Sequence, residues 1–130
     1  MSNKEVIRKW VDALRSGEFE QTKGQLGRVE EDGSRSYCCL GVLCELAARE
    51  GVIESARESD CAELIYDFAF STPPRTVDEW IGIDYAVNTP DELLDANDDY
   101  CDEIELTTLN DEEEFDFNQI ADAIERTWLA

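Results

Sequence analysis

The sequence predicts a helix-rich α+β fold: one compact domain over residues 1–130, with about four helices and two or three short strands. A length of 130 residues is usual for a single domain and is enough to bury one core. Apolar residues are spread over the whole chain, and no linker or internal repeat divides it. Helix-start and helix-stop signals recur, and the segments between them carry glycines or alternate apolar with polar residues, as short strands do.

The first helix is predicted to begin at Ser2, which forms a capping box with Glu5, and to end at Gly17. Apolar residues recur at every fourth position within it, namely Val6, Trp10 and Leu14. Residues 18–27 combine glycines with polar residues and predict a loop or an irregular strand. Residues 27–36 predict a turn between two extended pieces.

The run that starts at Tyr37 is apolar on nearly every side and predicts a central buried helix that ends at Gly51. Residues 61–70 stay open between helix and strand. Helical spacing would bring Leu64 and Phe68 together, but the aromatic residues of this segment suit a strand equally well.

A short helix is predicted after the prolines at 73–74, because Thr76 and Glu79 form a second capping box and Gly82 supplies a stop signal. Residues 89–92, Thr-Pro-Asp-Glu, give a third helix-start signal. A short strand is predicted from the alternation of Ile104, Leu106 and Thr108. The last helix carries one apolar face, made of Phe117, Ile120, Ala121, Ile124 and Trp128.

Acidic residues dominate the composition, since 32 Asp and Glu against 11 Lys and Arg give a net charge of −21. No Lys or Arg occurs between Arg75 and Arg126, an interval that contains 18 of the acidic residues. Such a surface repels nucleic acid and anionic membranes, so direct binding to either is not expected. Three origins of the acidity stay open: adaptation to a salt-rich host, mimicry of duplex phosphates, and weak cation binding or no role at all.

No apolar run approaches the roughly 20 residues of a membrane span. The first residues also lack the apolar segment of a signal peptide. We therefore expect a cytoplasmic protein whose five cysteines stay thiols.

Neither a metal site nor a cofactor is predicted. Cys38, Cys39 and Cys44 lack the CxxC spacing of structural zinc sites, and the chain has no histidine. Residues 95–106 carry carboxylates at calcium-loop spacing, but Tyr100 stands where glycine makes the sharp turn. No phosphate loop, GxSxG elbow or HExxH motif is present, and no catalytic residue is assigned.

The candidate ligand-binding segment is RSGEFEQTKGQLG, near the N-terminus, where long hydrogen-bond donors gather on Arg15, Gln21, Lys23 and Gln25. Arg and Lys supply charge-assisted donors to phosphate or carboxylate, and Gln offers an amide that suits a base edge. In an acidic chain this cluster indicates an anionic ligand, with Asn110 and Asp111 closing the site. The alternative is a loop held to its own backbone by the Gln side chains.

Four blocks cover most of the chain: WVDALRSGEFEQTKGQL, YCCLGVLCELA, TVDEWIG and LNDEEEFDFNQIADAIE. In this order they resemble an uncharacterised family of small tailed-phage and prophage proteins with W-x-x-A-L-R-S-G-x-[FY]-x-Q, C-C-L-G-V-L-C and L-N-D blocks. The resemblance implies a viral accessory protein that acts in the host cytoplasm in host takeover or evasion of defence. It brings no established catalytic residues. The chain departs from the pattern in EEEFDF, where a less charged turn is usual.

The leading hypothesis is a non-enzymatic viral accessory protein that binds a host protein or a small anionic ligand, such as a nucleotide signal of host defence. A second hypothesis makes the acidic half a nucleic-acid mimic that inhibits a host DNA- or RNA-binding protein. Its partner surface would consist of Asp98, Asp99, Glu112, Glu113 and Glu114. A third is hydrolysis of a signalling molecule. The sequence specifies neither the partner nor the oligomeric state.

Overall fold

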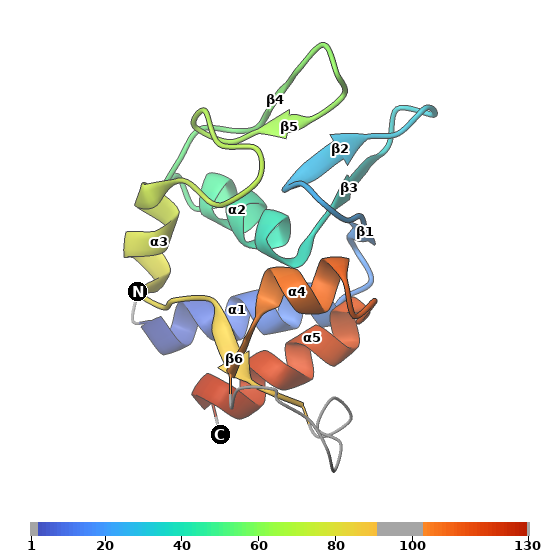
Figure 1. Cartoon of the computed structure of the whole chain (residues 1–130). Helices are drawn as coiled ribbons and strands as arrows, with labels where there is room; N and C mark the ends of the chain where they lie inside the picture. The colour runs from blue at the N-terminus through green and yellow to red at the C-terminus, as the bar shows by residue number, and fades with distance from the viewer. Residues whose placement is uncertain (1–2, 91–102, 130) are drawn as a thin grey trace.

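A computed structural model describes residues 3–90 and 103–129 (Figure 1). Over these residues the α+β class is confirmed, with more and shorter elements than predicted. The helices are α1 (Asn3–Arg15), α2 (Cys39–Arg49), α3 (Arg75–Ile81), α4 (Leu106–Asp111), α5 (Phe117–Ile124) and the π-helix η2 (Glu125–Leu129). The strands are β1 (Glu20–Gln21), β2 (Gly27–Val29), β3 (Arg35–Tyr37), β4 (Arg57–Glu58), β5 (Leu64–Ile65), β6 (Ala86–Asn88) and β7 (Glu103–Glu105). No helix in this part of the chain is long and apolar enough to cross a bilayer.

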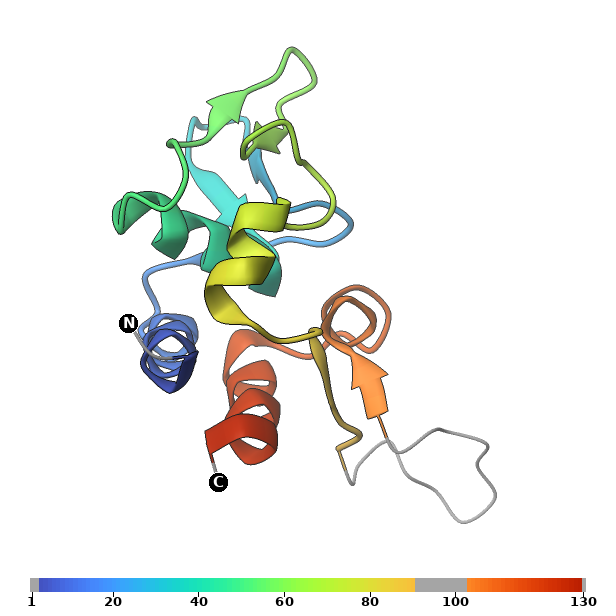
Figure 2. The ribbon, with the colours of Figure 1, turned by 90° about the vertical axis from the view of Figure 1, so that its left-hand side faces the viewer.

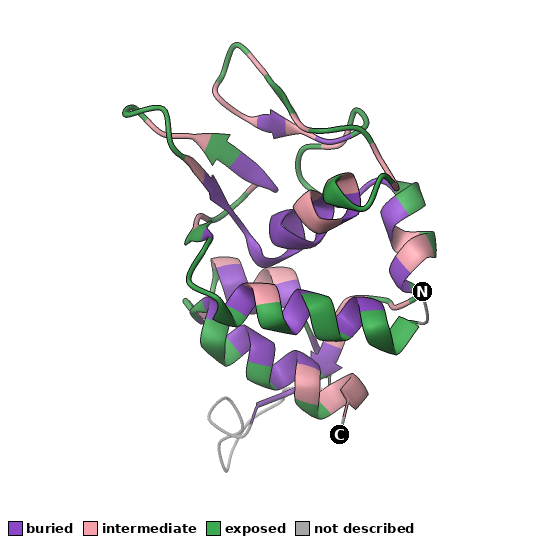
Figure 3. Ribbon diagram, turned by 180° about the vertical axis from the view of Figure 1, so that it is seen from behind, coloured by how far each residue is buried: buried purple, intermediate pink, exposed green. Residues whose placement is uncertain are grey.

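Two amphipathic helices from opposite ends of the chain, α1 and α5, lie side by side and bury their apolar faces against each other (Figures 1 and 3). The predicted periodicity is confirmed for Val6, Trp10 and Leu14, which are buried on α1, and for Ile120 and Ile124, which are buried on α5. Trp128, the last residue of the predicted face, lies beyond α5 in η2 and is half-buried. Their packing closes the fold. Ser2, the predicted first residue of the capping box, lies outside the described residues.

The central helix α2 follows a three-stranded sheet of order β1-β3-β2, in which β1 pairs parallel and β2 antiparallel to β3. It lies between this sheet and the lower helices α1 and α4 (Figures 1 and 2). Gly41 in its first turn touches the Leu26 backbone, where an added Cβ would lie 1.7 Å from the carbonyl oxygen. The helix can approach the sheet this closely because residue 41 has no side chain.

The segment 61–70 forms neither a helix nor a long strand. It supplies the two residues of β5, which pairs antiparallel with β4, and then a tight turn from Tyr66 to Ala69. Leu64 is buried but Phe68 is exposed, so the helical alternative, which placed these two side chains together, is wrong.

The predicted start of the third helix is also wrong. The helix α3 begins at Arg75 with Pro74 as N-cap and no side-chain capping bond, so the Thr76–Glu79 capping box does not form. The stop at Gly82 is confirmed by its left-handed φ of 71°. The proline side chain has no hydrogen-bond acceptor, so no side-chain capping bond can form with Pro74 at the N-cap.

The predicted strand over Ile104, Leu106 and Thr108 ends early. β7 stops at Glu105 and pairs antiparallel with β6, while Leu106 opens the unpredicted helix α4. Leu106 and Leu109 are fully buried at helical spacing, so packing against the core decides the conformation. The helix start predicted at 89–92 lies outside the described residues from residue 91 on, and so does most of the calcium-like loop at 95–106.

Candidate functional site

Two of the predicted ligand residues, Gln21 and Asn110, meet in a buried polar cluster. Asn110 is fully buried on α4. The Gln21 Nε2 group, at the end of β1, donates to Asn110 Oδ1 and to the Phe115 carbonyl, both at 2.8 Å. The backbone N–H of Cys39, at the start of α2, donates to the same Asn110 oxygen at 3.3 Å. The cluster therefore joins β1, α2 and α4.

The amide nitrogen of Asn110 holds a further segment. It donates to the Thr22 carbonyl at 2.9 Å and to Asp111 Oδ1 at 2.8 Å. That Asp111 oxygen also accepts from the Gly24 N–H at 3.0 Å. Every hydrogen-bonding atom of the Asn110 side chain thus has a partner, as a buried amide requires. We call the side chains of Gln21, Asn110 and Asp111, with the Cys39 N–H, the polar hub.

The polar hub joins three separated blocks of the sequence. Gln21 belongs to the first block, Cys39 to the cysteine-rich block and Asn110 to the L-N-D block. The groups that would face a ligand are engaged in holding the chain together. The hub acts as a structural cross-link, and ligand binding at these residues stays a prediction.

The other two predicted donors of this loop lie at its surface. The Lys23 Nζ group pairs with Glu114 Oε1 at 3.1 Å, and both side chains are exposed. Gln25 is half-buried, and its side chain makes no hydrogen bond to the described part of the chain. The loop is therefore tied down by Gln21, Lys23 and the Gly24 N–H, through partners on and after α4 rather than on its own backbone.

Arg15 is directed elsewhere, to helix α5. Its guanidinium donates to Asp122 Oδ1 at 2.6 Å and to Glu125 Oε2 at 3.1 Å. The hydrogen bond from Arg15 lowers the pKa of Glu125, and the same bond raises the pKa of Arg15. The structure does not join Arg15 to the other predicted ligand residues by a contact; it fastens α1 to α5.

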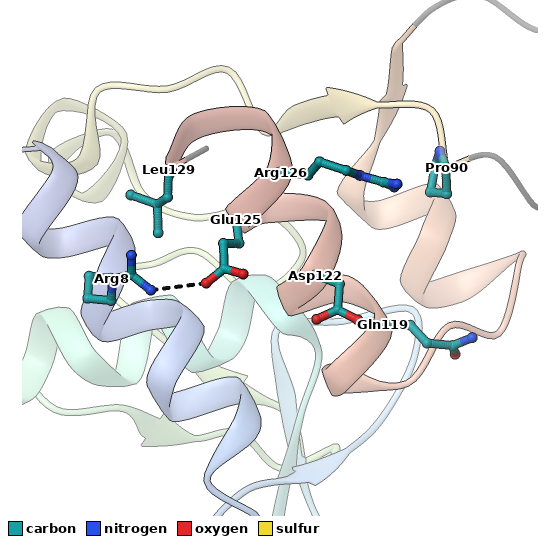
Figure 4. Close-up of a pocket in the computed structure, with 7 residues that line it drawn as sticks. All are labelled: Arg8, Pro90, Gln119, Asp122, Glu125, Arg126 and Leu129. Carbon is teal, nitrogen blue, oxygen red and sulfur yellow. Dashed lines mark hydrogen bonds and ion pairs between the residues drawn. The ribbon is translucent and has the colours of Figure 1, made fainter.

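The partners of Arg15 line a pocket of about 570 Å³ that the sequence did not indicate (Figure 4). Its lining consists of Arg8, Pro90, Gln119, Asp122, Glu125, Arg126 and Leu129. Arg8 pairs with Glu125 at 3.0 Å, whereas Arg126 extends toward Pro90. The π-helix η2 contributes Glu125, Arg126 and Leu129, and π-helical turns are rare and often occur at functional sites. Arg8 and Arg126 stand at opposite ends of the sequence, so no spacing pattern could have connected them.

The predicted acidic surface is described in part. Residues 111–116, which we call the acidic turn, carry five carboxylates between α4 and α5. Glu112 and Glu114 are exposed, Glu113 is half-buried, and Glu114 has a left-handed φ of 57°. Asp116 caps α5 by accepting from the Gln119 N–H at 2.8 Å. Asp98 and Asp99 lie outside the described residues.

Most of the positive charge of the chain is already neutralised by the chain itself. All eleven basic residues lie in the described ranges, and eight of them make ion pairs there. These are Arg8, Lys9, Arg15, Lys23, Arg28, Arg35, Arg49 and Arg75. In the described ranges nine carboxylates take part in these ion pairs, fewer than half of the acidic residues there, so the described surface offers carboxylates rather than cations.

A protein family described as a domain of unknown function (DUF8296) matches residues 2–128. The chain belongs to this family. No curated protein and no solved structure matches it. The DUF8296 match spans the polar hub, the acidic turn and every residue of the pocket lining except Leu129.

Three cysteines of this DUF8296 chain, Cys38, Cys39 and Cys44, are buried thiols at the start of α2 and within it. Burial raises the pKa of Cys38 to about 11 and raises the pKa values of Cys39 and Cys44 well above the ordinary thiol value. Cys61 is exposed. Over residues 3–90 and 103–129, no group of three metal-binding side chains comes together. Thiols buried in this way serve packing and are poor nucleophiles.

Proposed function

We propose that this DUF8296 chain is a non-enzymatic viral accessory protein that binds a host protein with a basic surface in the host cytoplasm. One observation carries the proposal: eight of the eleven cations are engaged by the chain's own carboxylates, while the net charge of −21 remains. A surface of this kind attracts a cationic partner at long range and raises its association rate. The viral origin rests on the sequence resemblance.

A protein partner is better supported than a small anion at the predicted site. The Gln21 and Asn110 amides are spent on the polar hub, and Arg15 and Lys23 are paired with carboxylates. An anion would have to displace those bonds and approach a strongly negative surface. Both requirements lower its affinity.

The acidic turn is the described surface most suited to the contact. Its five carboxylates share one ion-pair partner in the described chain, Lys23, which binds Glu114. Glu112 and Glu114 are exposed. Ion pairs formed there with a partner would be screened by salt, because exposed charges lose most of their interaction beyond the Debye length.

The test begins with recovery of the partner from host cells that produce the tagged full chain. Its affinity is then measured by calorimetry over a series of salt concentrations. The variant Glu112→Gln/Glu113→Gln/Glu114→Gln removes three charges from the acidic turn. The control Asp12→Asn/Glu31→Gln/Glu54→Gln removes three exposed charges from other elements. We expect the first variant to weaken binding and flatten its salt dependence, and the control to change both much less.

Other results would redirect the proposal. Release of the partner by competing DNA or RNA would identify the basic surface as a nucleic-acid groove and support mimicry. An affinity that does not depend on salt, or equal losses in both variants, would refute the role of the acidic turn.

A small anionic ligand remains the second candidate because of one feature, the pocket of Figure 4. Arg126 lines it and makes no ion pair with the described residues, unlike Arg8. A thermal-shift and calorimetry screen against cyclic and linear nucleotides, with Arg126→Gln as the negative control, tests this candidate. Turnover of a nucleotide in the same screen would instead indicate hydrolysis.

A further inference from the structure

The segment after β5 presents two phenylalanine side chains to solvent. Phe68 is 82% exposed and Phe70 is 50% exposed, and they are the exposed large hydrophobic residues among residues 3–90 and 103–129. The other three phenylalanines, Phe19, Phe115 and Phe117, are buried. Two exposed aromatic side chains that lie two residues apart in a chain of net charge −21 are a candidate interaction site.

The backbone holds Phe68 in a conformation that a bulky residue rarely adopts. Tyr66 and Ala69 exchange two hydrogen bonds of 2.8 Å around a two-residue turn. The φ angles of Asp67 and Phe68 are 51° and 69°, the left-handed pattern of a type I′ turn. Glycine is preferred at the second of these positions, so a phenylalanine there lowers the stability of the fold. Its presence indicates a role other than stability.

The base of this turn is firmly anchored. The buried Tyr66 donates its hydroxyl to Glu45 Oε1 of α2 at 3.0 Å. Behind the turn, the Phe70 carbonyl accepts from the Leu26 N–H at 2.8 Å. Arg57 of β4 lies over the Phe68 ring, 5.3 Å from its centroid. The backbone of the turn is therefore held in place before any partner arrives, which reduces the entropy cost of ordering this segment on binding.

Charge selects among the possible occupants. Carboxylates outnumber cations near the two rings along the sequence. Residues 57–70 contain one cation, Arg57, which lies over the Phe68 ring, and four carboxylates: Glu58, Asp60, Glu63 and Asp67. A second copy of the chain would bring another −21 charges to this surface, and an anionic membrane would be repelled in the same way. A protein pocket bordered by Lys and Arg satisfies both the apolar rings and their acidic surroundings.

We propose that Phe68 and Phe70 form an aromatic anchor that inserts into an apolar, basic-rimmed pocket of the partner protein. The anchor rests on the proposed function for the existence of a protein partner, and it adds a contact that is not electrostatic. The acidic turn would raise the association rate by long-range attraction, and the anchor would lower the rate of dissociation from the partner.

The experiment has two arms that use the full chain. In the first, a photo-crosslinking benzoylphenylalanine replaces Phe68 in host cells, with the same residue at the exposed position Asp12 as control. In the second, calorimetry with the purified crosslinked partner compares the original chain with Phe68→Gly, Phe70→Ser and the acidic-turn variant. Phe68→Gly suits the left-handed backbone, so a loss of binding cannot be assigned to misfolding once its thermal midpoint is measured.

We expect position 68, and not position 12, to crosslink one basic protein, and Phe68→Gly to weaken its binding at least about thirtyfold, as an interface anchor does. The loss should be the same at every salt concentration, whereas the acidic-turn variant changes the salt slope. Unchanged binding of Phe68→Gly together with a loss in the acidic-turn variant would overturn the anchor and leave the proposed function standing. Crosslinking to a second copy or to lipid would also overturn it.

Discussion

Replacing Phe68 by glycine and, separately, by alanine isolates the energy stored in its backbone. Both changes remove the ring and its contact with Arg57. Only the alanine variant keeps a Cβ at the left-handed φ of 69°. The pair therefore differs in the backbone term, while the lost side-chain interactions are shared.

The magnitude follows from three contributions. A residue with a Cβ costs about 1–2 kcal/mol in the left-handed region, and glycine costs about 0.5–1 kcal/mol through the extra freedom of the unfolded chain. The exposed contact with Arg57 contributes about 0.5 kcal/mol, and little burial is lost because Phe68 is 82% exposed. Phe68→Ala should therefore lower the free energy of unfolding by about 0.5 kcal/mol. The free energy of unfolding of Phe68→Gly should be higher than that of Phe68→Ala by about 1 kcal/mol.

The assay is thermal unfolding followed by circular dichroism, supported by urea titration. For a chain of this length, 1 kcal/mol corresponds to roughly 4 °C in Tm. The glycine variant is expected to melt at or above the temperature of the original chain and clearly above the alanine variant. An alanine variant as stable as the glycine variant would show that position 68 is not held at positive φ, and the structural argument for the anchor would then fail.

Three further predictions test other parts of the structure. Asn110→Ala should cost about 3 kcal/mol in urea unfolding, because the Cys39 N–H and the Thr22 carbonyl lose buried partners; a change below about 1 kcal/mol would contradict the role of the polar hub. Raising NaCl from about 0.1 to about 1 M shortens the Debye length from about 10 to about 3 Å and should raise Tm. Screening should relieve the repulsion within a chain of net charge −21 more than it weakens the exposed ion pairs. A falling Tm would show that the ion pairs dominate. Iodoacetamide at pH 8 should modify Cys61 well before the buried thiols, because with a pKa of about 11 Cys38 is only about 0.1% thiolate at that pH; rapid labelling of Cys38, read by mass spectrometry of peptides, would contradict its burial.

Much of the fold could be predicted because it is encoded locally. The spacing of Val6, Trp10 and Leu14 defines a helix face, and glycines at 17 and 51 adopt the left-handed φ that follows a helix. The turn between two extended pieces at 27–36 is present as the β2–β3 hairpin. In each case residues within a few positions of one another decide the conformation.

The errors arose where distant contacts decide. Leu106 alternates with its neighbours as a strand would, yet burial against the core draws it into α4. Residues 61–70 have no periodic preference, and hydrogen bonds to Ala62 and Phe70 from the β2 side place them. Sequence spacing contains no information about such partners.

The sequence by itself determined the α+β class, the amphipathic helices, the absence of a catalytic motif and the concentration of acid in the C-terminal half. Only the tertiary structure decided that Gln21 and Asn110 bond to each other, that Arg15 binds α5, and that Phe68 points to solvent. The physical reason is that composition and periodicity act over one helical turn or a strand pair. Whether a donor is free for a ligand depends on the residues that the fold brings within hydrogen-bond distance of it. For Gln21 that residue is Asn110, about 90 positions away in the sequence and within 3 Å in the structure.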